Sequence, residues 1–295
     1  MTLIQINNLR PGRLRALTGR TVKALGELVA TVLPALVRQQ EQAKRGRVDR
    51  QRAVGGGAKR QLAPAQEVLR VLIYLRHNVA HEVVGHLFGL SADLSENLFH
   101  ELVPRRREVF PANRLAAEKR FRRAGPRLEV EKTDRILIDS CETAIPRPAK
   151  QARQQRVYSG KKKRHTLKTQ VVTDATGAVL AVDAGQRGPA ADKKIYEASD
   201  VQEQFPQATQ QAELGYLGTD GGVETPHRKP RGGQLTDAQR EENRQMARVR
   251  VHVEHGIRRL KGFKIVRENY RHAMGLFPMV VSAVVGLVPL NRILQ

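Results

Sequence analysis

The sequence has no tryptophan, few aromatic residues and a single cysteine among its 295 residues. Aromatic residues make up only 4% of the chain, so the 40% of apolar residues must form a core that is mainly aliphatic. Cys141 has no second cysteine with which to form an internal disulfide, and this favours a reducing compartment. The N-terminus also lacks the apolar stretch of a secretory signal. We therefore expect a cytoplasmic protein.

The apolar run near the C-terminus is too short to cross a membrane. Residues 277–290 (FPMVVSAVVGLVPL) fall below the roughly 20 residues that a spanning helix needs, and Pro278 and Pro289 interrupt them. We expect this run to form a terminal core helix, and we expect no membrane partner.

Acidic residues are scarce relative to basic ones. The chain has 52 lysines and arginines against 29 aspartates and glutamates, a formal net charge of +23 and a pI near 11.0. Such a charge repels itself in the folded state, and a polyanionic partner offsets that repulsion. Nucleic acid explains the excess better than a membrane surface or a solubility role.

The first 60 residues are expected to form a helix followed by a basic linker. Residues 13–38 place apolar side chains at helical spacing, and Pro34 should kink or end that helix. Residues 39–60 are charged, interrupted by glycine and almost without apolar side chains. This linker is either an arm that grips a phosphate backbone or a solvated tether.

Residues 61–104 have the pattern of a helix-turn-helix. A first helix is expected from Pro64, with a break at residues 78–80. The second, residues 81–88, should end at Gly89, and Ser91 is a suitable N-cap for a third over residues 92–102. The alternative is an ordinary helical bundle.

The charge around the third helix bears on its contact with DNA. Arg105, Arg106 and Arg107 follow the helix directly and favour docking on DNA. The helix itself carries three acidic residues and little basic charge, which argues against base reading by this helix. DNA docking is thus expected from the module as a whole.

The rest of the chain has alternating strand and helix signals. A basic helix over residues 113–122 ends at Gly125-Pro126, which we take as a domain boundary. The expected elements that follow are strands at 135–138, 167–173 and 178–183, a turn at 174–177, a helix at 191–204, a short element at 210–218 and a helix at 236–260. This is the order of a ribonuclease-H-like α/β domain, a mixed sheet flanked by helices.

We therefore predict a small all-α helix-turn-helix domain before an α/β domain. The expected parts are residues 1–60 (N-terminal helix and basic linker), 61–125 (helix-turn-helix domain) and 126–295 (ribonuclease-H-like domain).

The segment from Asp134 to Lys168 combines acids with a cationic block. The apolar run at residues 136–138 ends on Asp139, and Glu142 follows. A β-branched run that ends on an acid is suited to hold a metal ligand at the edge of a sheet. The block at residues 161–165 (KKKRH) suits a polyanionic substrate.

Four segments of the chain carry a family resemblance, and their order along the chain is the order expected for the family. VYSGKKKRHTLKTQVVTD resembles the tyrosine–serine–glycine–lysine block of DDE transposases of bacterial insertion sequences, in the insertion-sequence-five-like group related to Harbinger-type transposases. RILIDSCETAIPRP resembles the first-aspartate strand of that group, and VRVHVEHGIRRLKGFKI resembles its glutamate helix. LFGLSADLSENLFHELVP resembles its helix-turn-helix segment. The resemblance covers about residues 55–275.

The resemblance implies a ribonuclease-H fold in which an acidic triad holds two divalent ions, Mg²⁺ or Mn²⁺. Asp139 falls at the first position and Glu254 at the third. Glu213 falls at the second position, where the group has aspartate. The extra methylene moves the carboxylate by about 1 Å, and a shift of that size can cost roughly 100-fold in rate.

Two other positions depart from the group. Ala247 stands where its signature has tyrosine, and Ala191 stands where histidine precedes an aspartate. That aspartate, Asp192, is either a carboxylate that starts a helix or an outer-shell partner of the metal site, and it is the secondary candidate for a metal ligand. Glu254 follows Val253 and precedes Ile257, so we expect it to lie among apolar residues and to need a partner or a metal.

The basic residues around these motifs are candidates for DNA contact, with a solvated surface as the alternative. Arg250 and Lys261 flank Glu254 on its helix and are expected to contact phosphates. The other candidates are Tyr158, Lys161, Lys162, Lys163, Arg164 and His165. Cys141 is expected to be a packing residue rather than a nucleophile.

Three functions fit the sequence. The first is a transposase that cuts element ends and joins them to target DNA, acting at the nucleoid as a homo-oligomer in a synaptic complex with double-stranded DNA. The second is a decayed transposase that acts only as a DNA-binding protein. The third is a ribonuclease-H-like nuclease that acts on RNA.

Overall fold

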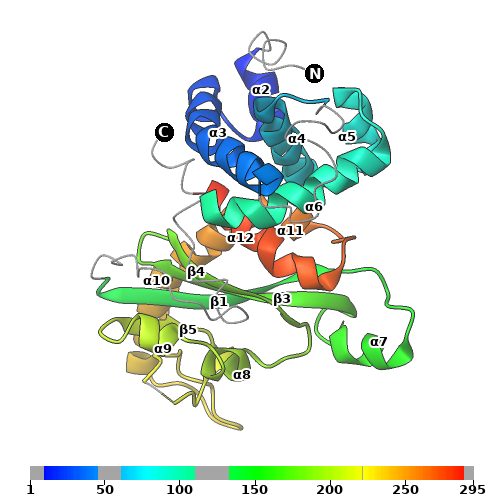
Figure 1. The fold of residues 1–295 in the computed structure, drawn as a ribbon. Coiled ribbons are helices and arrows are strands. Elements are labelled where there is room, and N and C mark those ends of the chain that lie inside the picture. The colour runs from blue at the N-terminus through cyan, green and yellow to red at the C-terminus, as the bar shows by residue number, and fades with distance from the viewer. Residues whose placement is uncertain (1–9, 46–60, 110–132, 221, 289–295) are drawn as a thin grey trace. The chain divides into compact units, whose positions relative to one another are not determined.

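The computed structural model describes residues 10–45, 61–109, 133–220 and 222–288, and the chain divides into two compact units. One unit contains the helices up to residue 109, and the other contains a β-sheet with its flanking helices (Figure 1). The helices of the first unit are α2 (Pro11–Thr18), α3 (Val22–Arg45), α4 (Pro64–His77), α5 (His81–Phe88) and α6 (Ala92–Val109). The predicted basic helix at 113–122 and the boundary at Gly125-Pro126 lie outside the described residues.

The prediction of one N-terminal helix over residues 13–38 is wrong, because two helices form and the second neither begins nor ends where expected. Gly19 (φ +73°) ends α2 with a left-handed cap whose N–H donates to the Arg15 carbonyl at 2.8 Å, so two helices form. Helix α3 then runs through Pro34 to Arg45. Proline removes one hydrogen bond, and the helix-forming residues at 39–45, predicted to be linker, offset that loss.

The helix-turn-helix prediction is confirmed. Helices α4 and α5 have the expected bounds, and Ser91 Oγ accepts a hydrogen bond from the Leu94 N–H at 3.2 Å to cap α6. α6 is longer than predicted and includes the positions of the three arginines. The buried Arg70 on α4 donates from Nη1 to the Ser95 carbonyl on α6 (2.8 Å), which fixes the first helix of the module against the last.

The second unit is built on a mixed sheet. Its strands are β1 (Arg135–Ala144), β2 (Tyr158–Ser159), β3 (Arg164–Asp174), β4 (Val179–Arg187) and β5 (Thr209–Ala212). β1 is central, antiparallel to β3 on one side and parallel to β5 on the other. β4 pairs with the opposite edge of β3, and β2 pairs with the first residues of β3.

Two expectations about strand and loop lengths are wrong. The first strand was expected to end at Ile138, but residues 139–144 also pair with β3, so Asp139 lies inside β1. No helix or strand was expected between the strands at 135–138 and 167–173, where we took the chain to be a basic loop, but this segment contains α7 (Gln151–Val157) and β2. The turn at residues 174–177 is confirmed, because Asp174 Oδ1 accepts the N–H groups of Thr176 and Ala178, both at 2.8 Å.

One face of the sheet packs on two short helices. These are α8 (Asp192–Glu197) and α9 (Val201–Gln204), where a single helix over 191–204 was expected. Ser199 donates its hydroxyl to the Tyr196 carbonyl (2.6 Å), a local bond that competes with continuation of the helix. Ile138 of β1, Ala212 of β5 and Tyr196 of α8 belong to the apolar core on this face.

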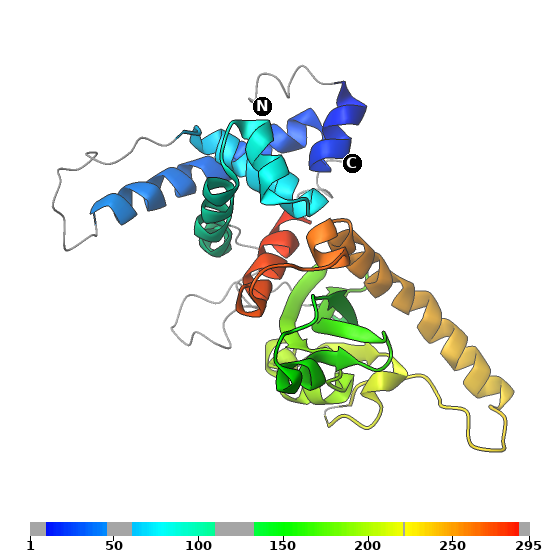
Figure 2. The same ribbon diagram turned by 90° about the vertical axis from the view of Figure 1, so that its right-hand side faces the viewer.

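The long helix α10 (Asp237–Lys261) covers the other face, as Figure 2 shows. Thr236 and Gln239 form the capping box that begins it. Two glycines let it approach the sheet. A Cβ at Gly177 (φ +77°) would overlap the backbone oxygen of His252, and one at Gly256 would lie 2.8 Å from Thr173 Cγ2.

The chain continues through short elements to a C-terminal helix. These elements are the 3-10 turn η3 (Leu214–Tyr216), α11 (Lys264–Arg267), the 3-10 turn η4 (Met274–Leu276) and α12 (Phe277–Leu287). The predicted terminal core helix is confirmed by α12, whose Val280, Val281 and Val284 are fully buried. None of the helices in the described ranges is both long enough and apolar enough to span a bilayer.

Candidate active site

Two acidic residues lie side by side where the parallel pairing of β1 and β5 ends. The register pairs Ile138 with Ala212, so Asp139 and Glu213 are the next residues of the two chain segments. Side chains alternate along a strand, so both acids face away from the core that contains Ile138 and Ala212. The adjacent Gln211 marks that face as the one under α10, because its side chain donates to the Met246 carbonyl at 3.1 Å.

Arg250 of α10 joins the second acid to the third. Its Nη2 lies 2.6 Å from Glu213 Oε1 and 3.6 Å from Glu254 Oε1. Arg250 and Glu254 are four residues apart and therefore one turn apart on the same helix. One guanidinium group thus contacts carboxylates from two distant parts of the chain.

Asp139 is coupled electrostatically to the same pair. Its pKa is raised to about 6, first by burial and then by the negative charge of Glu213. The Ser140 N–H, which donates to Asp139 Oδ1 at 2.6 Å, and the charge of Arg250 act in the opposite direction. Asp139 thus lies next to Glu213, and Arg250 links Glu213 to Glu254. In the part of the chain that the structure describes, the carboxylate oxygens of the three acids do not all lie within 4.8 Å of one another.

The expectation that Glu254 lies among apolar residues is wrong, because its side chain is 51% exposed. Each residue of a helix is rotated by about 100° from the one before it. Val253 and Gly256 turn toward the sheet and are buried, whereas Glu254 turns toward Arg250 and solvent. Its partner in the structure is Arg250, and its setting is not apolar.

The donor set at this site fits divalent cations. Mg²⁺ and Mn²⁺ take oxygen ligands, which three carboxylates supply. Burial and like charge disfavour ionised Asp139 even with Arg250 nearby, as its raised pKa shows. A bound cation would offset that cost.

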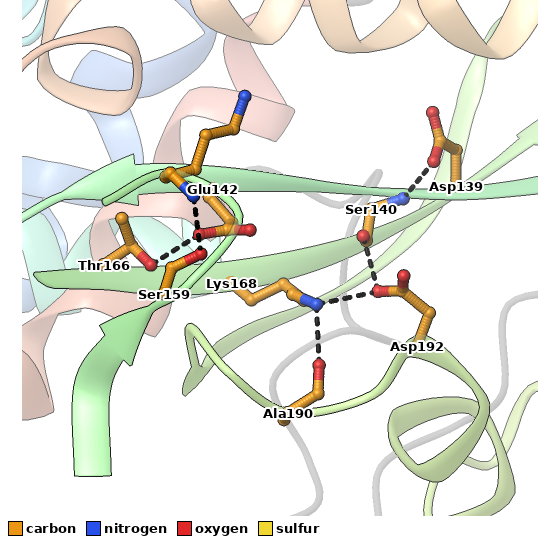
Figure 3. Close-up of polar contacts among 9 residues, drawn as sticks. Asp139, Ser140, Glu142, Ser159, Thr166, Lys168, Ala190 and Asp192 are labelled. Carbon is orange, nitrogen blue, oxygen red and sulfur yellow. Dashed lines mark hydrogen bonds and ion pairs between the residues drawn. The ribbon is translucent and has the colours of Figure 1, made fainter. Parts of the chain in front are cut away.

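Asp192 lies against the opposite face of β1, as the first residue of α8. Its Oδ1 accepts the Ser140 hydroxyl at 2.7 Å and the Lys168 amine at 3.0 Å (Figure 3). Asp139 and Ser140 are consecutive residues of β1, and their side chains point to opposite faces. Asp192 thus contacts the residue next to Asp139, and its negative charge also raises the pKa of Asp139.

The predicted cationic block lies on a β-hairpin. Tyr158 of β2 pairs with His165 of β3, and their rings meet edge to face at 5.5 Å. Residues 160–164 are exposed, and Lys163 adopts a left-handed backbone conformation (φ +53°) in the turn. The Lys162 N–H donates to Ser159 Oγ (3.2 Å), which shapes the turn. The hairpin therefore presents four consecutive cations to solvent.

Of the remaining DNA-contact candidates, the structure describes the surroundings of Lys261 but not those of the three arginines at positions 105–107. Lys261, near the end of α10, lies close enough to Cys141 to act on the pKa of its thiol. Burial dominates there and raises the pKa of Cys141 to about 11, so the thiol stays protonated and unsuited to be a nucleophile. The side chains of Arg105, Arg106 and Arg107 lie outside the described part of the structure.

Sequence reasoning missed Ser140 and Lys168. Lys168 lies within β3, its side chain is 9% exposed, and its amine also donates to the Ala190 carbonyl at 2.6 Å. A lysine inside the predicted strand at 167–173 was the available signal, because an ammonium group that becomes buried needs a partner. No sequence signal identifies that partner as Asp192, 24 residues away.

The family models match both units of the chain. The model described as "DDE superfamily endonuclease" matches residues 138–288, just over half of the chain. The chain belongs to this family. A second model, "Helix-turn-helix of DDE superfamily endonuclease", matches residues 60–112. The α/β unit of this DDE endonuclease is thus a ribonuclease-H-like domain preceded by a helix-turn-helix.

Two curated relatives have similar sequences over most of their length. The probable transposase for insertion sequence element IS702 of Microchaete diplosiphon is 29% identical over 239 residues, 78% of this chain and 82% of the relative. The putative transposase for insertion sequence element IS112 of Streptomyces albus G is 30% identical over 219 residues, 73% of this chain and 76% of the relative. No solved structure matches the chain.

The raised pKa of Asp139 predicts how stability depends on pH. An acid with a pKa of 3.8 when unfolded and about 6 when folded binds more protons in the folded state between these values, so stability falls as pH rises through them. At 1.36 kcal/mol per unit, the ionised group costs up to about 3 kcal/mol above pH 6. We expect Asp139→Asn to raise the free energy of unfolding by about 1–3 kcal/mol at pH 8, and by much less at pH 4, in denaturation with EDTA present.

The matched control is Glu203→Gln, which neutralises an exposed acid on α9 and should change stability little at either pH. An Asp139→Asn variant that is no more stable than the natural protein at pH 8 would contradict the presence of a destabilising buried carboxylate.

Proposed function

We propose that this DDE endonuclease is the transposase of an insertion sequence, which cleaves DNA strands and transfers the element ends to a target. Asp139, Glu213 and Glu254 would hold two divalent cations, Mg²⁺ or Mn²⁺. The proposal is supported by the contacts of Arg250 with Glu213, which lies next to Asp139, and with Glu254. The names of the two relatives support the same function.

The chemistry divides between the cations and the residues of the chain. When bound, the cations would supply Lewis-acid stabilisation of the phosphate and lower the pKa of the attacking water or 3′-hydroxyl. Arg250 and Lys261 would bind non-bridging phosphate oxygens from the same helix. The carboxylate of Glu213 would be shared between cation binding and its ion pair with Arg250.

DNA would be held by surfaces on both units. The hairpin of Tyr158, Lys161–Lys163, Arg164 and His165 offers exposed cations beside an exposed aromatic ring, which suits a phosphate backbone with a terminal base. The helix-turn-helix would dock on double-stranded DNA at the element ends, with Arg105–Arg107 on its flank. We further propose a homo-oligomer in a synaptic complex, located at the nucleoid.

A decayed, non-cleaving DNA-binding protein is the second candidate function, and Glu213 favours it. Glutamate occupies the position where the resembled group has aspartate, and its carboxylate is engaged by Arg250 at 2.6 Å. The longer side chain reaches the arginine, and this contact competes with cation binding. DNA binding would then be the only remaining activity.

Strand cleavage tests the proposed function directly. We expect the full chain with Mg²⁺ or Mn²⁺ to nick DNA that carries the ends of its element, scored on a denaturing gel. Asp139→Asn and Glu254→Gln should abolish the nicks and leave DNA affinity unchanged, because each removes a cation ligand but no phosphate contact. Glu241→Gln, at an exposed acid of α10 paired with Arg244, is the matched control and should cleave normally. Normal cleavage by Glu254→Gln would refute the site.

Glu213→Asp separates the two candidate functions. We expect it to raise the cleavage rate, by as much as roughly 100-fold, because the shorter acid restores the position that the resembled group uses and cannot reach Arg250 as closely. Single-turnover cleavage by the two proteins gives the ratio. Cleavage by the natural chain supports the transposase, whereas cleavage that begins only with Glu213→Asp supports the decayed protein.

The exposed hairpin predicts a salt-dependent contribution to binding. Replacement of Lys161, Lys162 and Lys163 by alanine should weaken DNA binding and reduce the slope of log K against log salt by up to about 3, near 0.9 per lost phosphate contact. Alanines at Arg228, Lys229 and Arg231, three exposed cations of the loop before α10, remove the same charge elsewhere. An equal effect from both triple variants would mean that net charge, and not the hairpin, holds the DNA.

A further inference from the structure

The network on the far side of β1 contains an ion pair that the proposed mechanism does not use. The Lys168 side chain is 9% exposed and the Asp192 side chain 25% exposed, and their charged atoms lie 3.0 Å apart. Desolvation of two such charges is costly, and a buried pair that loses one partner is strongly destabilising. Such a pair contributes little net stability by itself, so its contacts with residues beside the site are the feature that needs an explanation.

The Asp192 carboxylate of this ion pair contacts the chain just after Asp139 and lies close to the chain just after Glu213. Asp192 Oδ1 accepts the hydroxyl of Ser140, the residue after Asp139, at 2.7 Å. Asp192 Oδ2 faces Gly215, two residues after Glu213, where an added Cβ would lie only 2.9 Å away. One carboxylate thus touches β1 just past the first acid and η3 just past the second.

Lys168 fixes the position of that carboxylate. Its amine donates to Asp192 Oδ1 and to the Ala190 carbonyl (2.6 Å), so β3 is tied to the start of α8 (Figure 3). β3 is in turn paired with β1 along residues 166–174. The Asp192 carboxylate is therefore held in place by Lys168 of β3, a strand that carries none of the three acids.

Ser140 connects the Lys168–Asp192 pair on one face of the sheet to Asp139 on the other. The hydroxyl of Ser140 is bound to Asp192 on one face, while its N–H donates to Asp139 Oδ1 at 2.6 Å. A shift of Ser140 therefore moves a hydrogen-bond donor of the Asp139 carboxylate.

We propose that Lys168 and Asp192 are positioning residues, a buried brace that sets the spacing between Asp139 and Glu213 and thereby the selectivity of the site for Mg²⁺ over larger cations. Mg²⁺ demands near-ideal octahedral geometry, whereas Ca²⁺ accepts more ligands in looser arrangements. A rigid spacing favours Mg²⁺, and a loosened one removes that advantage. This inference rests on the proposed function, since it takes the three acids as cation ligands.

Cation binding without DNA tests the brace. Mn²⁺ binding to the full chain is measured by electron paramagnetic resonance, and Mg²⁺ and Ca²⁺ are titrated to displace it. Ser140→Ala, which cuts the link at its smallest residue, and Asp192→Asn should each weaken Mn²⁺ binding by roughly 10-fold or more, as outer-shell changes do. The ratio of Mg²⁺ to Ca²⁺ affinity should fall in both. Lys168→Met should act in the same way, with partial rescue by Lys168→Arg.

Thr166→Val is the matched control. It removes a hydrogen bond of the same kind on the same two strands, from Thr166 Oγ1 to Glu142 Oε2 (2.6 Å), without contact to Ser140 or Asp192. Its cation affinities should equal those of the natural chain. Thermal melting accompanies every variant, and Ser140→Ala, the mildest change, decides the question if Lys168→Met fails to fold.

The outcomes separate the brace from the site itself. Natural affinities and selectivity in Ser140→Ala and Asp192→Asn, with Mn²⁺ binding lost in Asp139→Asn, would overturn the brace and leave the proposed function standing. Equal losses in Thr166→Val would also overturn it, because the effect would be general to the strands. A natural chain that binds no divalent cation would overturn both.

Discussion

Repulsion between the carboxylates of Asp139 and Glu213 is the constraint on which the site depends, and the charge of Arg250 partly offsets it. Asp139 and Glu213 occupy equivalent positions on adjacent parallel segments, so they approach each other whenever the sheet forms. Glu254 is one helical turn from Arg250, so α10 brings the third acid and its counter-charge together. The chain thus supplies its own positive charge, Arg250, to Glu213 and Glu254.

The two faces of the sheet carry different groups of residues. Asp139 and Glu213 lie on the face covered by α10, and Arg250 and Glu254 are residues of that helix. The Glu254 side chain is exposed to solvent. Under α8 and α9 lie an apolar core and the Lys168–Asp192 pair. The two faces communicate at Asp139 and Ser140, since consecutive residues of a strand point to opposite sides. A chemical site and its support are therefore separated by a single layer of backbone.

The sequence was sufficient to predict the fold class and most of the helices and strands, because these follow from the period of apolar residues and from caps such as Ser91. The helix α7, the strand β2 and the division of two expected helices were not predicted. The sequence was also insufficient for the length of β1. Residues 139–144 have few apolar side chains and resemble a loop until β3 is present to pair with them. Likewise, nothing in the sequence around Ser199 showed that its hydroxyl would bond to the chain and split one helix into two.

The composition of the site was also only partly predictable. Motif resemblance identified the acids, and the structure places Asp139 next to Glu213 and links Glu213 to Glu254 through Arg250, but their roles stay predictions. The setting of Glu254 was predicted wrongly because neighbours along the sequence were treated as neighbours in space. The partners of Lys168 could not be predicted, since they come from a connection and a helix start whose positions depend on the whole fold.

The close approach of α10 to the β3–β4 hairpin has a consequence for how copies of such a gene lose activity. Gly177 and Gly256 leave no room for a side chain where helix and hairpin meet, and Glu254 is two residues from one of these contacts. A substitution at either glycine would lift the helix and carry the third acid away with every ligand still encoded. A gene copy can therefore encode all three acids and still yield an inactive enzyme, because one glycine has been replaced by alanine.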